Sequence, residues 1–161
     1  MLKGVVVRYA IDENECDDIL QESFIRAFKS LDTYAGRGEL GAWLRRVTIN
    51  VAMENYRKKK RIQQLNHEVQ IVYLQEERLN MEVLEQIHLE ELLKKIRMLP
   101  EGQRVIFNLY AVEGYTHVEI SGMLNISVGT SKSQYQRARK ALIQLIEKES
   151  QDEERRWNYA K

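Results

Sequence analysis

One side of a predicted helix near the C-terminus carries side chains that suit contact with DNA. At about 100° per residue, five polar side chains share this side of the helix that begins after Ser127. They are Lys132, Ser133, Gln136, Arg137 and Lys140. Ammonium and guanidinium groups bind phosphates, while hydroxyl and amide groups can also read base edges in a major groove. Taken alone, the stripe leaves open a second interpretation, an ordinary solvated basic helix.

The residues before this helix indicate how it is positioned. Thr116 and Glu119 have capping-box spacing and predict the start of a short helix, while Ser127 can cap the longer one. Asn125 lies in the turn between them, where asparagine tolerates left-handed backbone. A short helix, a tight turn and a longer helix form a helix-turn-helix, which favours DNA binding. The residues expected to face inward are Ile120, Met123, Leu124, Val128, Ser131, Tyr135, Ala138, Leu142 and Leu145.

A second polar stripe lies on a predicted helix from about Ala42 to Lys59. Its apolar residues fall on two sides, which predicts a helix packed on two sides. These sides hold Trp43, Leu44, Val47 and Val51, and Ile49, Ala52, Met53 and Tyr56. Between them lie Arg46, Asn50 and Arg57, and the basic run 57–61 can hold a phosphate backbone. Tyr34, in the loop before the helix, can stack on an unpaired base, with a half-buried loop aromatic as the alternative.

The elements that carry these stripes are predicted to be helical throughout. A single proline, few strand signals and apolar spacings of three and four indicate an all-α fold. The 161 residues suit one domain or two small ones. We expect helices over 17–31, about 42–59, 81–98 and 101–114, with Gly114 as a C-cap and a polar linker at 62–80. The first helix is expected to pack through Ile19, Leu20, Phe24, Ala27, Phe28 and Leu31.

Composition places the chain among soluble globular proteins. Hydrophobic residues make up 43% and charged residues 30%, and the formal net charge is +1. There is therefore no overall basic field, and the basic residues instead form blocks between acidic ones. No apolar run approaches the roughly 18 residues that span a bilayer, and no signal peptide is visible. We expect a cytoplasmic protein without membrane insertion.

The sequence offers no residues for an enzyme active site. Cys16 is the single cysteine, so an intramolecular disulfide is excluded, and we interpret it as a small buried side chain. His67, His88 and His117 lie far apart without metal-ligand spacing, and His117 is expected at the surface. No phosphate loop or nucleophile motif is present. We therefore expect no catalytic residue, no metal and no cofactor.

Two long segments resemble the extracytoplasmic-function (ECF) group of bacterial sigma factors, in the sigma-70 family. Region 2 of that family is similar to "DDILQESFIRAFKSLDTYAGRGELGAWLRRVTINVAMENYRKKKR", and region 4 to "LPEGQRVIFNLYAVEGYTHVEISGMLNISVGTSKSQYQRARKAL". The resemblance implies a region 2-like domain at 1–61, a linker at 62–80, a region 4-like helix-turn-helix domain at 81–148 and a charged tail at 149–161. It also implies a shortened first helix, which would leave Val5, Val6, Val7 and Tyr9 without part of their packing partner.

The resemblance assigns roles to particular residues. It implies a −10 element site at Tyr34, Arg46, Asn50, Arg57 and Lys58, where a flipped non-template base would be held. The −35 element would meet Lys132, Ser133, Gln136, Arg137 and Lys140. Contact with polymerase would involve Asp17, Asp18, Gln21 and Phe24.

The same resemblance names the partners. They are promoter DNA and core RNA polymerase, through the clamp helices of its largest subunit and the flap of its second-largest subunit, and an anti-sigma factor. Two other functions remain open on the residues alone. One is a helix-turn-helix regulator that acts without polymerase, and the other is an interaction module whose basic stripes bind acidic protein.

Overall fold

All regular elements in the described part of the chain are helices. The computed structural model describes residues 2–34, 36, 38–66 and 89–159. The described residues form two compact units, one built on the elements before residue 67 and one on the elements after residue 88 except for residues 123–125, which are grouped with the first unit. The predicted all-α fold with two small helical domains is confirmed. None of the helices within the described ranges combines the length and apolar character needed to cross a membrane.

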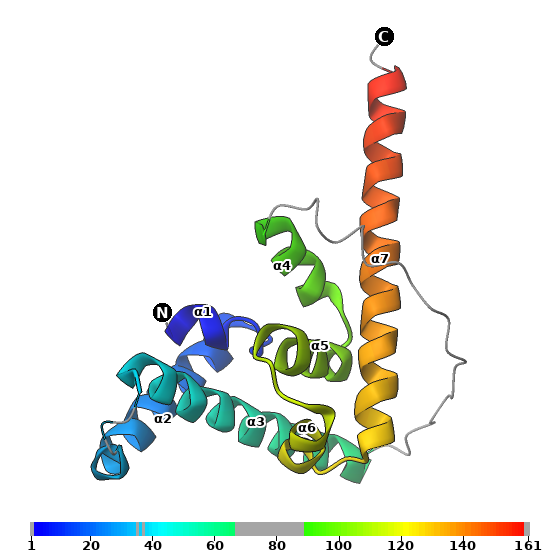
Figure 1. Cartoon of the computed structure of the whole chain (residues 1–161). Coiled ribbons are helices and arrows are strands. Elements are labelled where there is room, and N and C mark those ends of the chain that lie inside the picture. The colour runs from blue at the N-terminus through cyan, green and yellow to red at the C-terminus, as the bar shows by residue number, and fades with distance from the viewer. Residues whose placement is uncertain (1, 35, 37, 67–88, 160–161) are drawn as a thin grey trace. The chain divides into compact units, whose positions relative to one another are not determined.

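The N-terminal unit is built on two long helices (Figure 1). Its elements are α1 (Leu2–Val6), α2 (Glu13–Lys29), the short 3₁₀ helix η1 (Leu31–Thr33) and α3 (Leu40–Asn66). α2 begins where the Asp12 carboxylate accepts a hydrogen bond from the backbone N–H of Glu15 at 2.8 Å. α2 packs along α3, and α1 packs against both. The two long helices thus form the frame on which the N-terminal site residues lie.

The core of this unit includes the short first helix. Val5, Val6 and Tyr9 are buried and Val7 is half-buried. The expectation that the shortened first helix leaves these residues without part of their packing partner is therefore wrong for Val5, Val6 and Tyr9. Cys16 is also buried, as predicted.

The packing face of α2 differs from the predicted one. Cys16, Ser23 and Ala27 are buried along with Ile19, whereas Phe24 is 47% exposed and Phe28 76% exposed. The Ser23 hydroxyl is satisfied by donating to the Ile19 carbonyl at 2.6 Å. The small side chains of this face pack against α3, whereas Phe24 and Phe28 lie on a different side of the helix. The prediction that Phe24, Phe28 and Leu31 pack in the core is wrong, because Leu31 is also 49% exposed.

The C-terminal unit is built around the longest helix, α7 (Val128–Tyr159). It also contains α4 (Leu89–Met98), α5 (Glu101–Phe107), the π-helix η3 (Asn108–Val112) and α6 (His117–Leu124). α4 and α5 pack on α7 (Figure 1). Their shared core holds Ile96, Leu99, Phe107, Ala138 and Leu142. One side of α7 is therefore buried in this core, while the opposite side faces solvent.

Several helices end at other residues than predicted. α3 continues to Asn66, so residues 62–66 of the predicted linker are helical, and α7 remains helical through most of the predicted tail. The helix expected over 101–114 changes to a π-helix at Asn108 and ends before Gly114, whose φ of +78° confirms the predicted glycine cap. Residues 67–80 of the linker, and 81–88 of the helix expected over 81–98, lie outside the described residues. The domain boundaries stay predictions.

Candidate nucleic-acid interface

The helix-turn-helix has the local geometry that the sequence predicts. The backbone N–H of Thr116 donates to the Glu119 carboxylate at 2.8 Å, and the N–H of Glu119 donates to the Thr116 hydroxyl at 3.2 Å. These reciprocal bonds form the capping box of α6. Asn125 has a φ of +54° in the turn, and the Ser127 hydroxyl accepts from the Thr130 N–H at 2.9 Å. Both helix starts and the left-handed turn are confirmed.

The polar stripe of α7 lies on the side opposite the core. Lys132, Ser133, Gln136 and Lys140 are exposed, and Arg137 is half-buried. The inward face contains Ser131, Ala138 and Leu142, each 0% exposed, with Val128, Tyr135 and Leu145 half-buried. At 1.5 Å per residue, the stripe is about 12 Å long, which matches roughly three to four base pairs. The stripe can therefore present cationic, hydroxyl and amide groups together to one groove.

His117 departs from its predicted place at the surface. It is half-buried, and its Nδ1 lies 2.9 Å from the Ser131 hydroxyl oxygen. Its ring stacks on Tyr110 at 4.3 Å between centroids. Burial, followed by the nearby Lys132 charge, lowers the pKa of His117. The sequence could not reveal this contact, because the capping-box pattern fixes where α6 begins but not what the next side chain meets.

The second polar stripe runs along the outer side of α3. Arg46, Asn50, Arg57 and Lys58 are exposed, while Ile49, Ala52, Met53 and Tyr56 beneath them are buried. Trp43, Leu44 and Val47, from the other predicted apolar side, are only half-buried. Val51 is the one residue of that side that is buried, so the predicted packing on two sides is confirmed for the side with Ile49 and only in part for the side with Trp43.

The basic run at the end of α3 is not uniformly available. Lys59 forms an ion pair with Glu15 of α2, and Asn55 donates to the same carboxylate at 2.7 Å. Lys60 lies 5.9 Å from the centroid of the Tyr56 ring. Arg57 and Lys58 are the members of this run that both belong to the predicted site and are exposed.

Tyr34 is held in place within its loop. It is half-buried, its hydroxyl donates to the Gly38 carbonyl at 2.7 Å, and its ring lies 5.5 Å from that of Trp43. Gly38 has a φ of +88°, a conformation that favours glycine. The free chain thus matches the half-buried alternative, with the ring held by a hydrogen bond at one end and an indole beside it.

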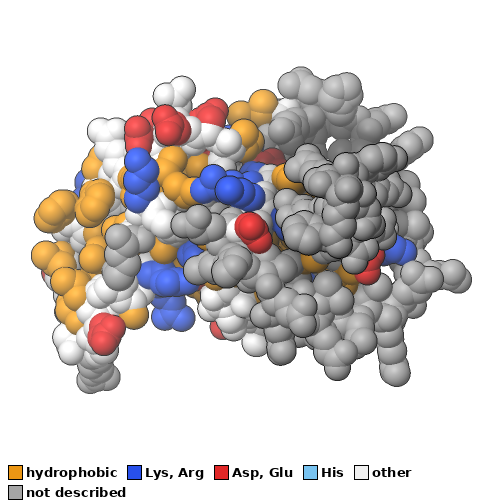
Figure 2. All heavy atoms as spheres, turned by 90° about the horizontal axis from the view of Figure 1, so that it is seen from above, with side chains coloured by type: hydrophobic (Ala, Val, Ile, Leu, Met, Phe, Trp, Pro, Cys, Tyr) orange, Lys and Arg blue, Asp and Glu red, His pale blue; other side chains and the backbone are white. Residues whose placement is uncertain are grey.

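The predicted polymerase-contact residues share the outer side of α2. Asp17, Asp18, Gln21 and Phe24 are all exposed. Three further apolar residues are exposed next to them: Ile25 at 41%, Phe28 at 76% and Leu31 at 49%. We call Phe24, Ile25, Phe28 and Leu31 the apolar ridge. Figure 2 shows hydrophobic side chains gathered at one end of the N-terminal unit, where α2 ends and α3 begins.

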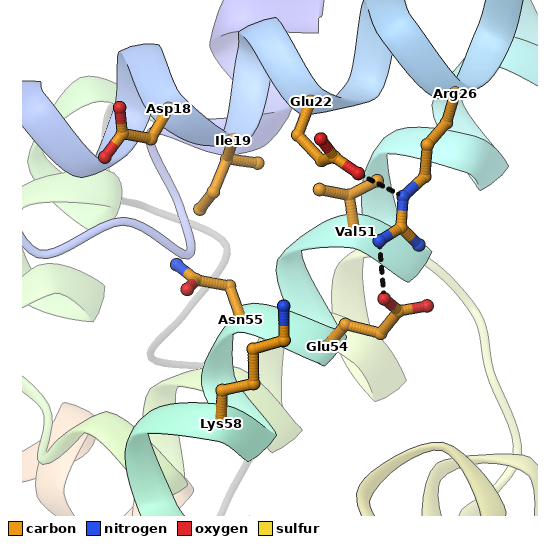
Figure 3. Close-up of a pocket in the computed structure, with 8 residues that line it drawn as sticks. All are labelled: Asp18, Ile19, Glu22, Arg26, Val51, Glu54, Asn55 and Lys58. Atoms are coloured by element: carbon orange, nitrogen blue, oxygen red, sulfur yellow. Dashed lines mark hydrogen bonds and ion pairs between the residues drawn. The ribbon is translucent and has the colours of Figure 1, made fainter. Parts of the chain in front are cut away.

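A groove separates α2 from α3 on the same unit (Figure 3). It has a volume of about 260 Å³ and is lined by Asp18, Ile19, Glu22, Arg26, Val51, Glu54, Asn55 and Lys58. Its buried apolar floor is formed by Ile19 and Val51. Arg26 bridges the two helices, because its guanidinium lies 2.7 Å from both the Glu22 and the Glu54 carboxylates. The Arg26 hydrogen bond lowers the pKa of Glu54 against the opposing effect of burial.

Within residues 2–34, 36, 38–66 and 89–159, no group of three or more histidine, cysteine, aspartate or glutamate side chains is placed to hold an ion.

Comparison with known proteins gives matches over both units. The model of Sigma-70 region 2 matches residues 1–62, and that of Sigma-70 region 4 matches residues 89–142. The ECF RNA polymerase sigma factor SigW of Bacillus subtilis is 32% identical over 138 residues, covering 80% of this chain and 74% of that protein. The RNA polymerase sigma-H factor of Pseudomonas aeruginosa is 26% identical, with coverage of 89% and 79%.

A solved structure has the same fold. It is the sigma factor RpoE of Bartonella quintana, in complex with the anti-sigma factor NepR. The two chains superpose with a TM-score of 0.55 at 22% identity, over 91% of this chain and 89% of the other.

The Arg26–Glu54 ion pair makes the stability of the N-terminal unit pH-dependent. Because the pKa of Glu54 is lowered in the folded state, its stabilisation is complete above the ordinary carboxyl pKa and is lost as the pH falls through the folded value. Both side chains are about a third exposed, so we expect Glu54→Gln to cost about 0.2–1 kcal/mol at pH 7. This cost should shrink towards pH 4.

Urea unfolding followed by Trp43 fluorescence, in a Trp157→Phe background, measures this difference. The matched control is Asp32→Asn, a similar change at an exposed position of η1. A Glu54→Gln cost that is the same at pH 7 and pH 4 would contradict the linkage.

Proposed function

The chain belongs to the ECF sigma factors of the sigma-70 family, and from that premise we propose which of its residues do the work of promoter recognition. It directs core RNA polymerase to promoters, with region 4 recognising the −35 element and region 2 recognising and melting the −10 element. Members of this family are not enzymes, and we propose that this chain has no active site and no cofactor. We further propose that it acts in the cytoplasm and that the division into 1–61, 62–80, 81–148 and 149–161 describes its functional parts.

The separation of polar and buried faces on α7 carries the −35 proposal. Lys132 and Lys140, at the two ends of the exposed stripe, would bind phosphates and fix the register of the helix. Ser133, Gln136 and Arg137, between them, would contact base edges, where a good bidentate pair discriminates by about 1–3 kcal/mol. The dry opposite face holds these side chains on a rigid helix.

The −10 proposal is supported by the arrangement around the start of α3. A flipped base must be captured strongly enough to offset an unstacking cost of a few kcal/mol. Tyr34 is held by Gly38 and Trp43, so a base that stacks on it would immobilise little additional side chain. Arg46 and Asn50 would supply hydrogen bonds, while Arg57 and Lys58 would hold the backbone.

The outer side of α2 supports the polymerase proposal. Asp17, Asp18 and Gln21 offer polar contacts. The apolar ridge offers exposed hydrophobic side chains, which are typical of a protein-binding surface. An aromatic anchor ringed by polar groups is typical of a strong interface. We propose that the clamp helices of the largest polymerase subunit bind here and that an anti-sigma factor inhibits by covering the same ridge. The flap of the second-largest subunit would bind the C-terminal unit.

Run-off transcription with core polymerase tests the −10 assignment. The parent should initiate from a selected promoter, and Asn50→Ala should lower open-complex formation by about tenfold, because a captured base loses a hydrogen bond of about 1–3 kcal/mol. Closed-complex binding at low temperature should change much less. Permanganate reactivity of unpaired thymines measures opening, and Asn14→Ala, at an exposed position of α2, is the control. Equal losses in both steps would overturn the assignment.

Arg137 is tested with two promoters that differ only in the −35 element. Arg137→Ala should reduce the preference for the intact element by about tenfold, within the range of a lost bidentate contact. Gln144→Ala removes an exposed polar side chain two turns further along α7 and should leave the preference unchanged. If the isolated chain binds the promoter as tightly as the holoenzyme does, the polymerase-independent regulator becomes the better description.

Phe28 is tested by competition for core polymerase. Phe28→Ser removes an aromatic side chain that is 76% exposed in the free protein, so it should leave folding nearly unchanged. It should weaken polymerase binding by about tenfold or more, since burying such a side chain contributes about 1.5–3 kcal/mol. Ile62→Ser is the matched control, with a residue 61% exposed on α3. Unchanged affinity for Phe28→Ser would remove the ridge from the interface.

A further inference from the structure

His117 joins the two helices of the helix-turn-helix through a partly buried hydrogen bond. It is the first residue of α6, and its Nδ1 lies 2.9 Å from the hydroxyl of Ser131 in the first turn of α7. Ser131 is 0% exposed, so its hydroxyl cannot turn to water instead. A buried hydroxyl that loses its partner is costly. The bond therefore fixes the start of α7 relative to the start of α6.

Aromatic rings hold the imidazole in one orientation. Tyr110 of η3 stacks on it with an interplanar angle of 13°, and Tyr135 of α7 meets it edge-on at 5.8 Å. The two tyrosine rings also contact each other, with centroids 4.6 Å apart. Three elements thus converge on one side chain. An imidazole packed in this way has a better defined hydrogen-bond direction than an exposed imidazole would have.

The next residues along α7 are the first two of the polar stripe. Lys132 and Ser133 directly follow Ser131, and both are exposed. A contact at Ser131 controls their rotation about the helix axis and their reach. Recognition requires side chains held to within about 0.5 Å and 10–20° of the productive geometry. The His117–Ser131 hydrogen bond lies directly before Lys132 and Ser133, so it can fix the positions of these two side chains.

We propose that His117 is a positioning residue for −35 recognition, which acts by holding Ser131 so that Lys132 and Ser133 face the DNA. The inference rests on the proposed role of α7 in reading the −35 element. His117 itself contacts neither base nor phosphate in this proposal. Burial, followed by the Lys132 charge, lowers the pKa of His117, which favours the neutral imidazole. A neutral ring can pair with a hydroxyl as donor or as acceptor.

The test uses holoenzyme, assembled from the full chain and core polymerase, on promoters with an intact or a scrambled −35 element. His117→Phe retains a ring for Tyr110 but has no nitrogen, and Ser131→Ala removes the hydroxyl. Each should lower the preference for the intact element about three- to tenfold, the effect of one lost hydrogen bond. The double variant should lose no more than either single one, because both remove the same contact.

A conservative variant separates positioning from general stability. His117→Asn places an amide near the position of Nδ1, so it should restore the preference to within about twofold of the parent even though it loses the stacking on Tyr110. Val118→Ala, at the next and 68% exposed position of α6, is the control. Thermal melts by circular dichroism confirm that each variant is folded at the assay temperature.

The outcomes distinguish a failure of the proposed function from a failure of the positioning role of His117. If the parent does not initiate from any selected promoter, the proposed function itself fails. If the parent initiates but folded His117→Phe and Ser131→Ala keep its −35 preference, the hydrogen bond only stabilises the unit and the positioning role is overturned. If His117→Phe fails to fold, the other two variants decide. The positioning role is supported if Ser131→Ala loses the preference for the intact −35 element while His117→Asn keeps it. The role is overturned if these two variants have the same preference.

Discussion

Each unit depends on one long helix that is dry on one side and polar on the other. In α7, Ser131, Ala138 and Leu142 are completely buried while Lys132 and Gln136 are exposed. In α3, Ile49 and Met53 are buried beside the exposed Arg46 and Asn50. Burial of the apolar side provides the free energy that stabilises the helix, so the helix does not depend on its polar side for stability.

Local capping chemistry made the helix-turn-helix predictable. Thr116, Glu119, Ser127 and Asn125 act through bonds and backbone angles within a few residues, so their roles follow from residue type and spacing alone. The same is true of the two faces of α7, because a helical period of 3.6 fixes which residues share a side. Helix ends were less predictable, since α3 and α7 continue through polar sequence that has no stop signal.

Phe28 and His117 show where sequence reasoning stops. Periodicity detects an apolar face but cannot distinguish one that packs in the core from one that is left exposed, and Phe28 is 76% exposed. The buried face of α2 is instead marked by Cys16, Ser23 and Ala27, whose small size matters only once α3 is in place. His117 meets Ser131 across fourteen residues of chain, and no local pattern encodes such a contact.

Internal acids explain how a chain of nearly zero net charge carries two basic stripes. Glu15 pairs with Lys59, and Glu54 pairs with Arg26, so part of the basic surplus is neutralised within the N-terminal unit. Other cations, among them Arg57, Lys58, Lys132 and Lys140, remain exposed on helix faces. Non-specific DNA affinity rises with the number of phosphates that are neutralised, so each internal ion pair lowers the number of cations that can bind phosphate. The apolar ridge is exposed on the N-terminal unit, and under the proposed function its burial against polymerase would add to the free energy of promoter binding by the holoenzyme.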